Sequence, residues 1–149
     1  MSTSATTTTR GMSARTSHES TSNTVRNVSE LVGRSFLAVL FLLSGLGKIG
    51  AYSATAAYMS SVGVPSVLLP VVIATEVLGA IAIILGWQTR VAALLLAGYA
   101  LLAAVVFHTN FADQIEMIMF LKNVSIAGGF LLLVANGAGP LSLDRRLAS

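Results

Sequence analysis

The chain has 149 residues, of which 54% are hydrophobic and only 10% charged, with a formal net charge of +3 and no cysteine. A soluble domain of this size has too little interior to bury so much apolar surface, so the composition excludes a soluble globular protein. Without cysteine the chain has no thiolate metal site and no disulfide exchange. Without a basic patch interleaved with aromatic residues, we expect no nucleic-acid partner.

The first 29 residues differ from the rest of the chain. They are dominated by serine and threonine and contain almost no side chain that a core would bury. Such a composition predicts a disordered segment. We therefore expect a Ser/Thr-rich cytoplasmic tail at residues 1–29 and a membrane domain at residues 30–146.

Four apolar segments follow the tail, at residues 32–49, 67–85, 90–107 and 115–135. The hydrocarbon core of a bilayer is about 30 Å thick and needs about 20 apolar residues per helix, so each segment is long enough to cross it. The sequence predicts an all-α membrane protein, a bundle of four transmembrane helices. The connection at residues 50–64 is long enough to contain a short interfacial helix.

Cations near the ends of spans predict the orientation, because lysine and arginine are retained on the cytoplasmic side. On one side of the predicted bundle fall Arg34, Arg90, Arg145 and Arg146. The other side has Lys48. With an even number of spans, we expect both termini to face the cytoplasm.

A carboxylate, Glu76, lies in the middle of the second span. An ionised side chain at this depth costs about 2.5 to 3.5 kcal/mol on insertion scales, so it faces the bundle interior and has a partner or a function. By helical rise, Glu76 lies roughly 14 Å below the start of its span and Lys122 roughly 10 Å below the start of the fourth. Lys122 is therefore the first candidate partner and Lys48 the second. His108 and Asn123 complete the predicted polar cluster, whose alternative role is a buried ion pair that fixes helix register.

The motifs of several membrane enzymes are missing from the sequence. His18 lies in the tail, which leaves His108 as the one histidine near a span, so a single chain does not supply two axial ligands for haem. No glycine-rich phosphate loop and no Ser, His and Asp arrangement stands out. The sequence therefore predicts no catalytic residue and no metal site, and we do not expect the isolated chain to be an enzyme.

Several short motifs resemble those of the DoxX family of small bacterial inner-membrane proteins. In chain order they are Arg34, Ser44-Gly45-Leu46-Gly47-Lys48, Val64-Pro65, Glu76, Leu85-Gly86-Trp87-Gln88-Thr89-Arg90 and Gly139-Pro140-Leu141-Ser142-Leu143-Asp144. The resemblance covers about residues 30 to 146 and excludes the tail. It implies a four-helix bundle in the cytoplasmic membrane.

The resemblance also implies a redox connection, since some relatives are subunits of a thiosulfate:quinone oxidoreductase and others are linked to an oxidative-stress complex in the membrane. We therefore expect a subunit or scaffold of a redox-related complex, surrounded by lipid, with protein partners or copies of itself and with quinone as a candidate ligand. Two other classes remain open. One is a small proton-coupled exporter that uses Glu76, and the other is a membrane chaperone or cargo-binding protein that uses the interfacial loop around Tyr52 and Tyr58.

Overall fold

The computed structural model describes the backbone of residues 7–148 and the side chains of residues 21–148. Its elements are α1 (Thr7–Gly50), α2 (Tyr52–Ser61), a 3₁₀ turn η1 (Ser66–Leu68), α3 (Leu69–Leu85), α4 (Thr89–Phe107), α5 (Gln114–Asn136) and α6 (Leu143–Leu147). The described part of the chain contains no strand. The predicted all-α fold, with a short helix between the first two spans, is therefore confirmed.

Four segments are long and apolar enough to cross a membrane, namely Thr21–Gly50, Ser66–Leu85, Thr89–Phe107 and Gln114–Asn136. They correspond to the four predicted spans, with boundaries that differ by a few residues at most positions. Pro70 lies in the first turn of α3, where a missing backbone donor leaves no intrahelical bond unmade. Asp113 caps α5 by accepting a hydrogen bond from the Ile115 amide at 2.7 Å.

The first span begins earlier than the sequence predicts. Residues 7–29, expected to be a disordered tail, are continuous with α1, and residues 1–6 lie outside the described residues. Helix propagation adds one hydrogen bond per residue once a turn has formed, and this segment contains no proline to stop it. No break in the backbone marks the predicted boundary at residue 29, and the division into two domains stays a prediction.

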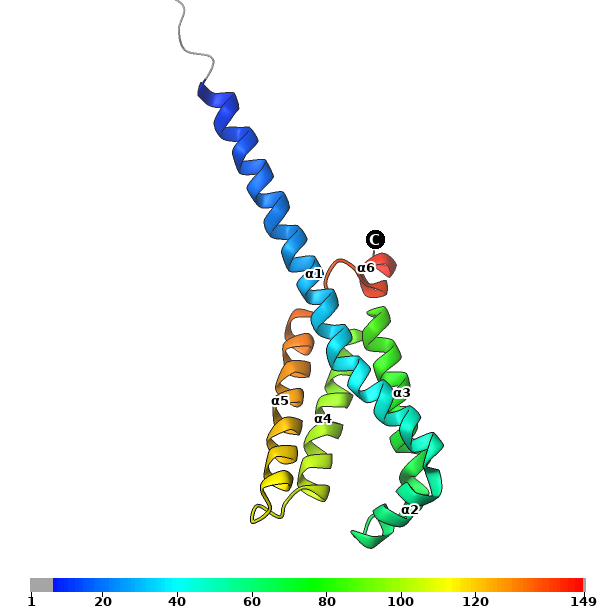
Figure 1. Cartoon of the computed structure of the whole chain (residues 1–149). Helices are drawn as coiled ribbons and strands as arrows, with labels where there is room; N and C mark the ends of the chain where they lie inside the picture. The colour runs from blue at the N-terminus through cyan, green and yellow to red at the C-terminus, as the bar shows by residue number, and fades with distance from the viewer. Residues whose placement is uncertain (1–6, 149) are drawn as a thin grey trace, which may run out of the picture.

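Two helix pairs form the bundle, α1 with α3 and α4 with α5, and the packing of α3 on α4 joins them. By comparison, α1 and α5 have few close approaches. Figure 1 shows α2 at the end of the bundle opposite α6, and it shows α1 extending past the bundle on the side of α6. We call these the α2 end and the α6 end.

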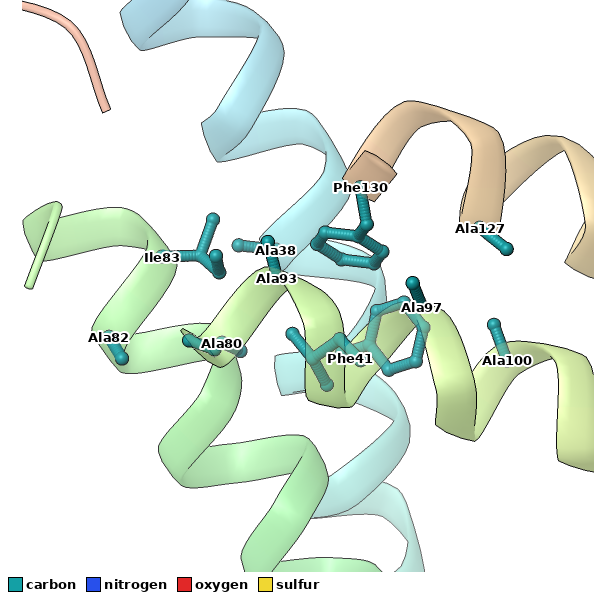
Figure 2. Packing of buried hydrophobic residues seen from close by; sticks show 12 residues of the cluster. Ala38, Phe41, Ala80, Ala82, Ile83, Ala93, Ala97, Ala100, Ala127 and Phe130 are labelled. Atoms are coloured by element: carbon teal, nitrogen blue, oxygen red, sulfur yellow. The ribbon is translucent and has the colours of Figure 1, made fainter. Parts of the chain in front are cut away.

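Small residues of α4 form the centre of the packing. A stripe of alanines is buried, with exposures of 2% or less at Ala93, Ala97, Ala100 and Ala104. Larger side chains of the other helices fill the space beside them, and Figure 2 shows Phe41 of α1 and Phe130 of α5 next to each other beside α4. The two rings meet edge to face, with their centroids 5.4 Å apart. Without a hydrophobic driving force in lipid, such close packing is what holds the helices together.

Candidate functional site

Glu76 of α3 is the most deeply buried acid in the described part of the chain, with 2% of its surface exposed. It faces α1 at a point where the two helices approach closely. The approach depends on Gly45, because a Cβ atom there would lie 2.7 Å from Val77 Cγ2 and 3.2 Å from Glu76 Cβ. The Ser-Gly-Leu-Gly-Lys motif therefore brings two polar side chains of α1 against the carboxylate of α3.

Three side chains donate hydrogen bonds to the Glu76 carboxylate. Lys48 Nζ lies 2.9 Å from both carboxylate oxygens, and it also donates to Ser44 Oγ at 2.6 Å. Ser44 Oγ donates to Glu76 Oε1 at 3.2 Å, and Tyr99 of α4 donates its hydroxyl to the same oxygen at 2.8 Å. We call Ser44, Lys48, Glu76 and Tyr99 the carboxylate cluster. Its bonds join α1, α3 and α4 and keep an ionised group satisfied within the membrane.

Lys122, which the sequence placed first as a partner of Glu76, does not contact it in the structure. Its Nζ donates to Met119 Sδ at 3.0 Å, one turn earlier on α5. The position of a residue along its helix predicts its depth in the membrane. It does not predict which neighbouring helix the side chain faces. Since α5 packs mainly on α4, Lys122 lies on the far side of the bundle interior, while Lys48 is on the helix that packs against α3. The second candidate, Lys48, is the partner.

A cavity of about 390 Å³ lies between the two helix pairs toward the α2 end. All five residues of the predicted polar cluster line it, namely Lys48, Glu76, His108, Lys122 and Asn123. The rest of the lining is mostly aliphatic and aromatic. Tyr58 of α2 stacks on Phe107 of α4 with ring centroids 5.7 Å apart, so α2 forms part of the wall. The sequence therefore named residues that share one cavity, although it ranked Lys122 ahead of Lys48 as the partner of Glu76.

The polar groups on the α5 side of this cavity are separate from the carboxylate cluster. His108 Nδ1 lies 2.8 Å from Glu116 Oε2, and Asn123 Nδ2 donates to the Met119 carbonyl at 2.9 Å. No carboxylate of the described residues pairs with Lys122. An ammonium group whose nearest acceptor is a thioether retains protons to donate to a ligand oxygen. The described residues bring no group of three or more potential metal ligands together here or elsewhere.

Tyr99 is the residue of this site that the sequence analysis missed. A tyrosine in the middle of an otherwise aliphatic span needs a partner for its hydroxyl group, which was the available signal. Its ring packs edge to face on Phe41, with centroids 6.1 Å apart, and this contact directs the hydroxyl toward Glu76. Ser44 was named only as part of a family motif, but its hydroxyl also belongs to the cluster.

A second polar cluster lies at the α6 end, where the segment after α5 folds onto the turn between α3 and α4. The Arg34 guanidinium of α1, 3% exposed, donates to the Ala138 carbonyl at 2.6 Å and to the Leu141 carbonyl. The Asp144 amide donates to the Gly86 carbonyl at 2.8 Å. These contacts fasten the C-terminal segment to both α1 and the turn.

The Asp144 side chain completes this second cluster. It accepts hydrogen bonds from the backbone amides of Gln88 at 2.7 Å and Thr89 at 2.9 Å, so it caps α4 from outside the helix. Partial burial opposes ionisation of Asp144, but the bonds from Thr89 and Gln88 and the charge of Arg34 outweigh it, and the pKa of this carboxyl lies below its ordinary value.

We call Arg34, Gly86, Gln88, Thr89, Ser142 and Asp144 the terminal clamp. Gly86 ends α3 in the left-handed region, with φ of 68°, and a Cβ atom there would lie 2.5 Å from Ser142 Cβ and 2.7 Å from Arg34 Nη1. The four arginines used to predict orientation all lie on elements at this end. Arg34 belongs to the clamp, Arg90 donates to the Ala135 carbonyl at 3.4 Å, and the other two are on α6.

Comparison with known proteins identifies the family of this chain. The DoxX family model matches residues 29–109. Inner membrane protein YqjF of Escherichia coli strain K12 is 46% identical over 123 residues, which cover 83% of this chain and 95% of that protein. Inner membrane protein YphA of the same organism is 43% identical over 128 residues, which cover 81% of this chain and 91% of that protein. No solved structure gives a significant match. The chain belongs to the DoxX family of inner-membrane proteins.

Proposed function

We propose that the chain is an integral subunit or scaffold of a redox-related complex in the inner membrane, and that its cavity holds quinone or a similar small lipophilic molecule. The observation that carries this proposal is the cavity of about 390 Å³ between the helix pairs, which combines an apolar lining with polar groups at membrane depth. Cavities of this size with a few convergent polar groups are typical of small-molecule sites. The redox context comes from the family resemblance.

The polar groups of the cavity fit a carbonyl-bearing ring. Lys122 and Asn123 lie next to each other on α5 and both line the cavity. The ammonium of Lys122 is a hydrogen-bond donor without a carboxylate partner among the described residues, so it suits a quinone oxygen. Aromatic side chains of Phe41, Tyr58 and Phe107 supply flat apolar surface for the ring.

The competing exporter function makes a different demand on Glu76. An exporter must release and rebind a proton at this carboxylate as its substrate moves. The structure has all three donors of the carboxylate cluster directed at Glu76, an arrangement that favours a structural role for this side chain. A chaperone function would require the surface around Tyr52 and Tyr58, and Tyr58 instead stacks on Phe107.

A paired experiment tests the subunit against the exporter. The protein is purified in mild detergent, and co-purifying proteins and extractable quinones are identified for wild type and for Glu76→Gln. We expect partners and quinone to be retained in both, because the amide still hydrogen-bonds within the cluster and the stability falls only modestly. Proton-driven uptake of lipophilic cations into proteoliposomes by the wild type, lost in Glu76→Gln, would overturn the subunit proposal in favour of the exporter.

A second variant tests the ligand. Lys122→Met removes the cavity ammonium while conserving length and apolar volume, and the matched control Ser125→Ala changes an exposed polar group of α5 outside the cavity lining. We expect the quinone content of the purified protein to fall several-fold in Lys122→Met and to stay unchanged in Ser125→Ala. Absence of quinone from the wild type, with partners retained, would reduce the proposal to a scaffold.

We also propose that both termini face the cytoplasm. This orientation is supported by the clustering of Arg34, Arg90, Arg145 and Arg146 at the α6 end, since cations at span ends are retained on the cytoplasmic side. Reporter fusions after Ser149 and after Ser60 report the two sides, and we expect opposite responses with the Ser149 fusion in the cytoplasm. A Ser60 reporter in the cytoplasm would invert the assignment.

A further inference from the structure

The α6 end contains a second hollow, separate from the cavity and larger. Its volume is about 910 Å³, and its walls come from α1, the turn between α3 and α4, the start of α4 and the segment after α5. Three arginines on three different elements line it, namely Arg26, Arg90 and Arg145. We call it the arginine pocket.

Two acids also line the arginine pocket, Asp144 and Glu30; both make contacts there, although Glu30 Oε2 is buried without a hydrogen-bond partner. Asp144 accepts bonds from two backbone amides of the terminal clamp. Glu30 lies one helical turn from Arg26, with 3.8 Å between Oε1 of the acid and Nε of the arginine. Neither Arg90 nor Arg145 has a carboxylate within ion-pair distance among the described residues. The pocket therefore presents two guanidinium groups with unused donors, the geometry that binds phosphate oxygens best.

The depth of the pocket identifies where a phosphate would come from. Its residues lie where α4 begins and α5 ends, at the boundary of two membrane spans. Trp87, half exposed in the adjacent turn, is the residue type that marks the headgroup level of a bilayer. The phosphates nearest to the arginines are therefore those of the surrounding lipids.

An apolar groove of about 700 Å³ continues from this pocket along the lipid-facing side of α3 and α4. The two share Gln88 and Val91, so the groove begins where the arginine pocket opens. Its length runs from Trp87 at the α6 end to Pro70 at the start of α3, past small residues such as Ala74 and Gly79. A charged pocket joined to a long apolar groove has the shape and polarity of one phospholipid, with the headgroup among the arginines and an acyl chain against the helices.

We propose that the arginine pocket and its groove form a binding site for one anionic phospholipid. Each arginine near a headgroup phosphate contributes about fivefold in affinity, and the two without carboxylate partners contribute about 30-fold together. The proposal concerns the arginine pocket and its groove and does not depend on the function of the cavity.

Native mass spectrometry of the full chain in detergent tests the site. The probes are phosphatidylglycerol and phosphatidylcholine with identical acyl chains. We expect one phosphatidylglycerol molecule to be retained preferentially, about fivefold less in Arg145→Gln and about 30-fold less in Arg90→Gln with Arg145→Gln. The charge-matched control is Arg146→Gln, on the same short helix but outside the pocket lining, and it should bind as the wild type does. Equal retention of the two lipids, or wild-type binding by the double variant, would overturn the proposal.

Two further arms separate the lipid from other sources of phosphate. Ala74→Phe fills the groove from an exposed position, and we expect it to lower lipid retention, whereas Ser125→Phe on the lipid-facing side of α5 should not. Inorganic phosphate should fail to displace the lipid even at high millimolar concentration. Displacement by inorganic phosphate, or indifference to Ala74→Phe, would assign the arginines to a soluble anion and refute the lipid site.

Discussion

The carboxylate cluster and the terminal clamp both fasten α1 to α3 and α4, but they do so with different partners. In the cluster, Glu76 is bonded by side chains alone, within the membrane. In the clamp, Arg34 and Asp144 bond backbone groups of turns at the end of the bundle. Side chains must satisfy Glu76 because the surrounding helices have already used their own backbone groups. At the α6 end, backbone carbonyls and amides of the turns have no partner within a helix. The charged side chains of Arg34 and Asp144 form hydrogen bonds with them there.

Breaking the carboxylate cluster should have the largest effect on stability. Replacing Glu76 with leucine leaves the Lys48 ammonium without its counter-ion, and a broken buried pair costs about 3 to 5 kcal/mol. Replacing Lys48 with leucine should have a comparable effect, and the double variant should lose less than the sum of the two. Unfolding in detergent measures all three.

The variant Lys122→Leu supplies the control for this double-mutant cycle of Glu76 and Lys48. Because Lys122 contacts Met119 and not Glu76, the losses from Lys122→Leu and Glu76→Leu should couple much more weakly than those from Lys48→Leu and Glu76→Leu. Coupling of Glu76 to Lys122, with additivity toward Lys48, would show that the cluster is assigned to the wrong lysine.

The turn of the terminal clamp should be the next most sensitive point. Gly86 and Gly63 both have positive φ, 68° and 80°, but a Cβ atom at Gly63 would have no neighbour within 4 Å. We expect Gly63→Ala to lose about 1 kcal/mol from backbone strain alone. Gly86→Ala should lose about 2 to 3 kcal/mol, because the added methyl group also displaces Ser142 and Arg34. Equal losses of stability for the two variants in thermal unfolding would mean that Ser142 and Arg34 move aside without a cost in free energy.

The smallest effect we predict belongs to Asp144, and it depends on pH. Loss of a helix cap in Asp144→Ala should cost about 1 kcal/mol near neutral pH. Since the folded-state pKa of Asp144 lies below its ordinary value, its stabilisation is fully present above the unfolded pKa of about 3.9 and is lost as pH falls through the folded pKa. The wild-type advantage should therefore be constant from pH 7 to about 5 and disappear in stronger acid.

Asp144→Asn is the matched variant for this measurement. The amide keeps one acceptor oxygen for the Gln88 or Thr89 amide but does not titrate. We expect Asp144→Asn to lose less stability relative to the wild type than Asp144→Ala does. The stability of Asp144→Asn should also lack the acid dependence that residue 144 causes in the wild type. An unchanged difference between wild type and Asp144→Ala down to pH 3 would contradict the cap.

The sequence predicted the spans well because membrane thickness fixes their length and Gly86, Pro65 and Pro70 mark their ends. It also selected residues that share a cavity, since polar groups at similar depth in one bundle must turn inward. It failed on the choice between Lys48 and Lys122, because helical rise gives depth and not direction around the axis. The sequence also did not predict the hydrogen bonds from the Gln88 and Thr89 amides to Asp144. A capping contact between residues 55 apart leaves no local sequence pattern.

The terminal clamp also has a consequence for the order in which the protein is assembled. Asp144 is synthesised 55 residues after Thr89, whose backbone amide donates to it. The Ala138 carbonyl is synthesised 104 residues after Arg34, the side chain that donates to it. During synthesis from the N-terminus, the hairpin of α3 and α4 therefore enters the membrane with its connecting turn still open to water. Because α6 is made after all four spans, it closes that turn late and locks a junction whose two helices were inserted much earlier.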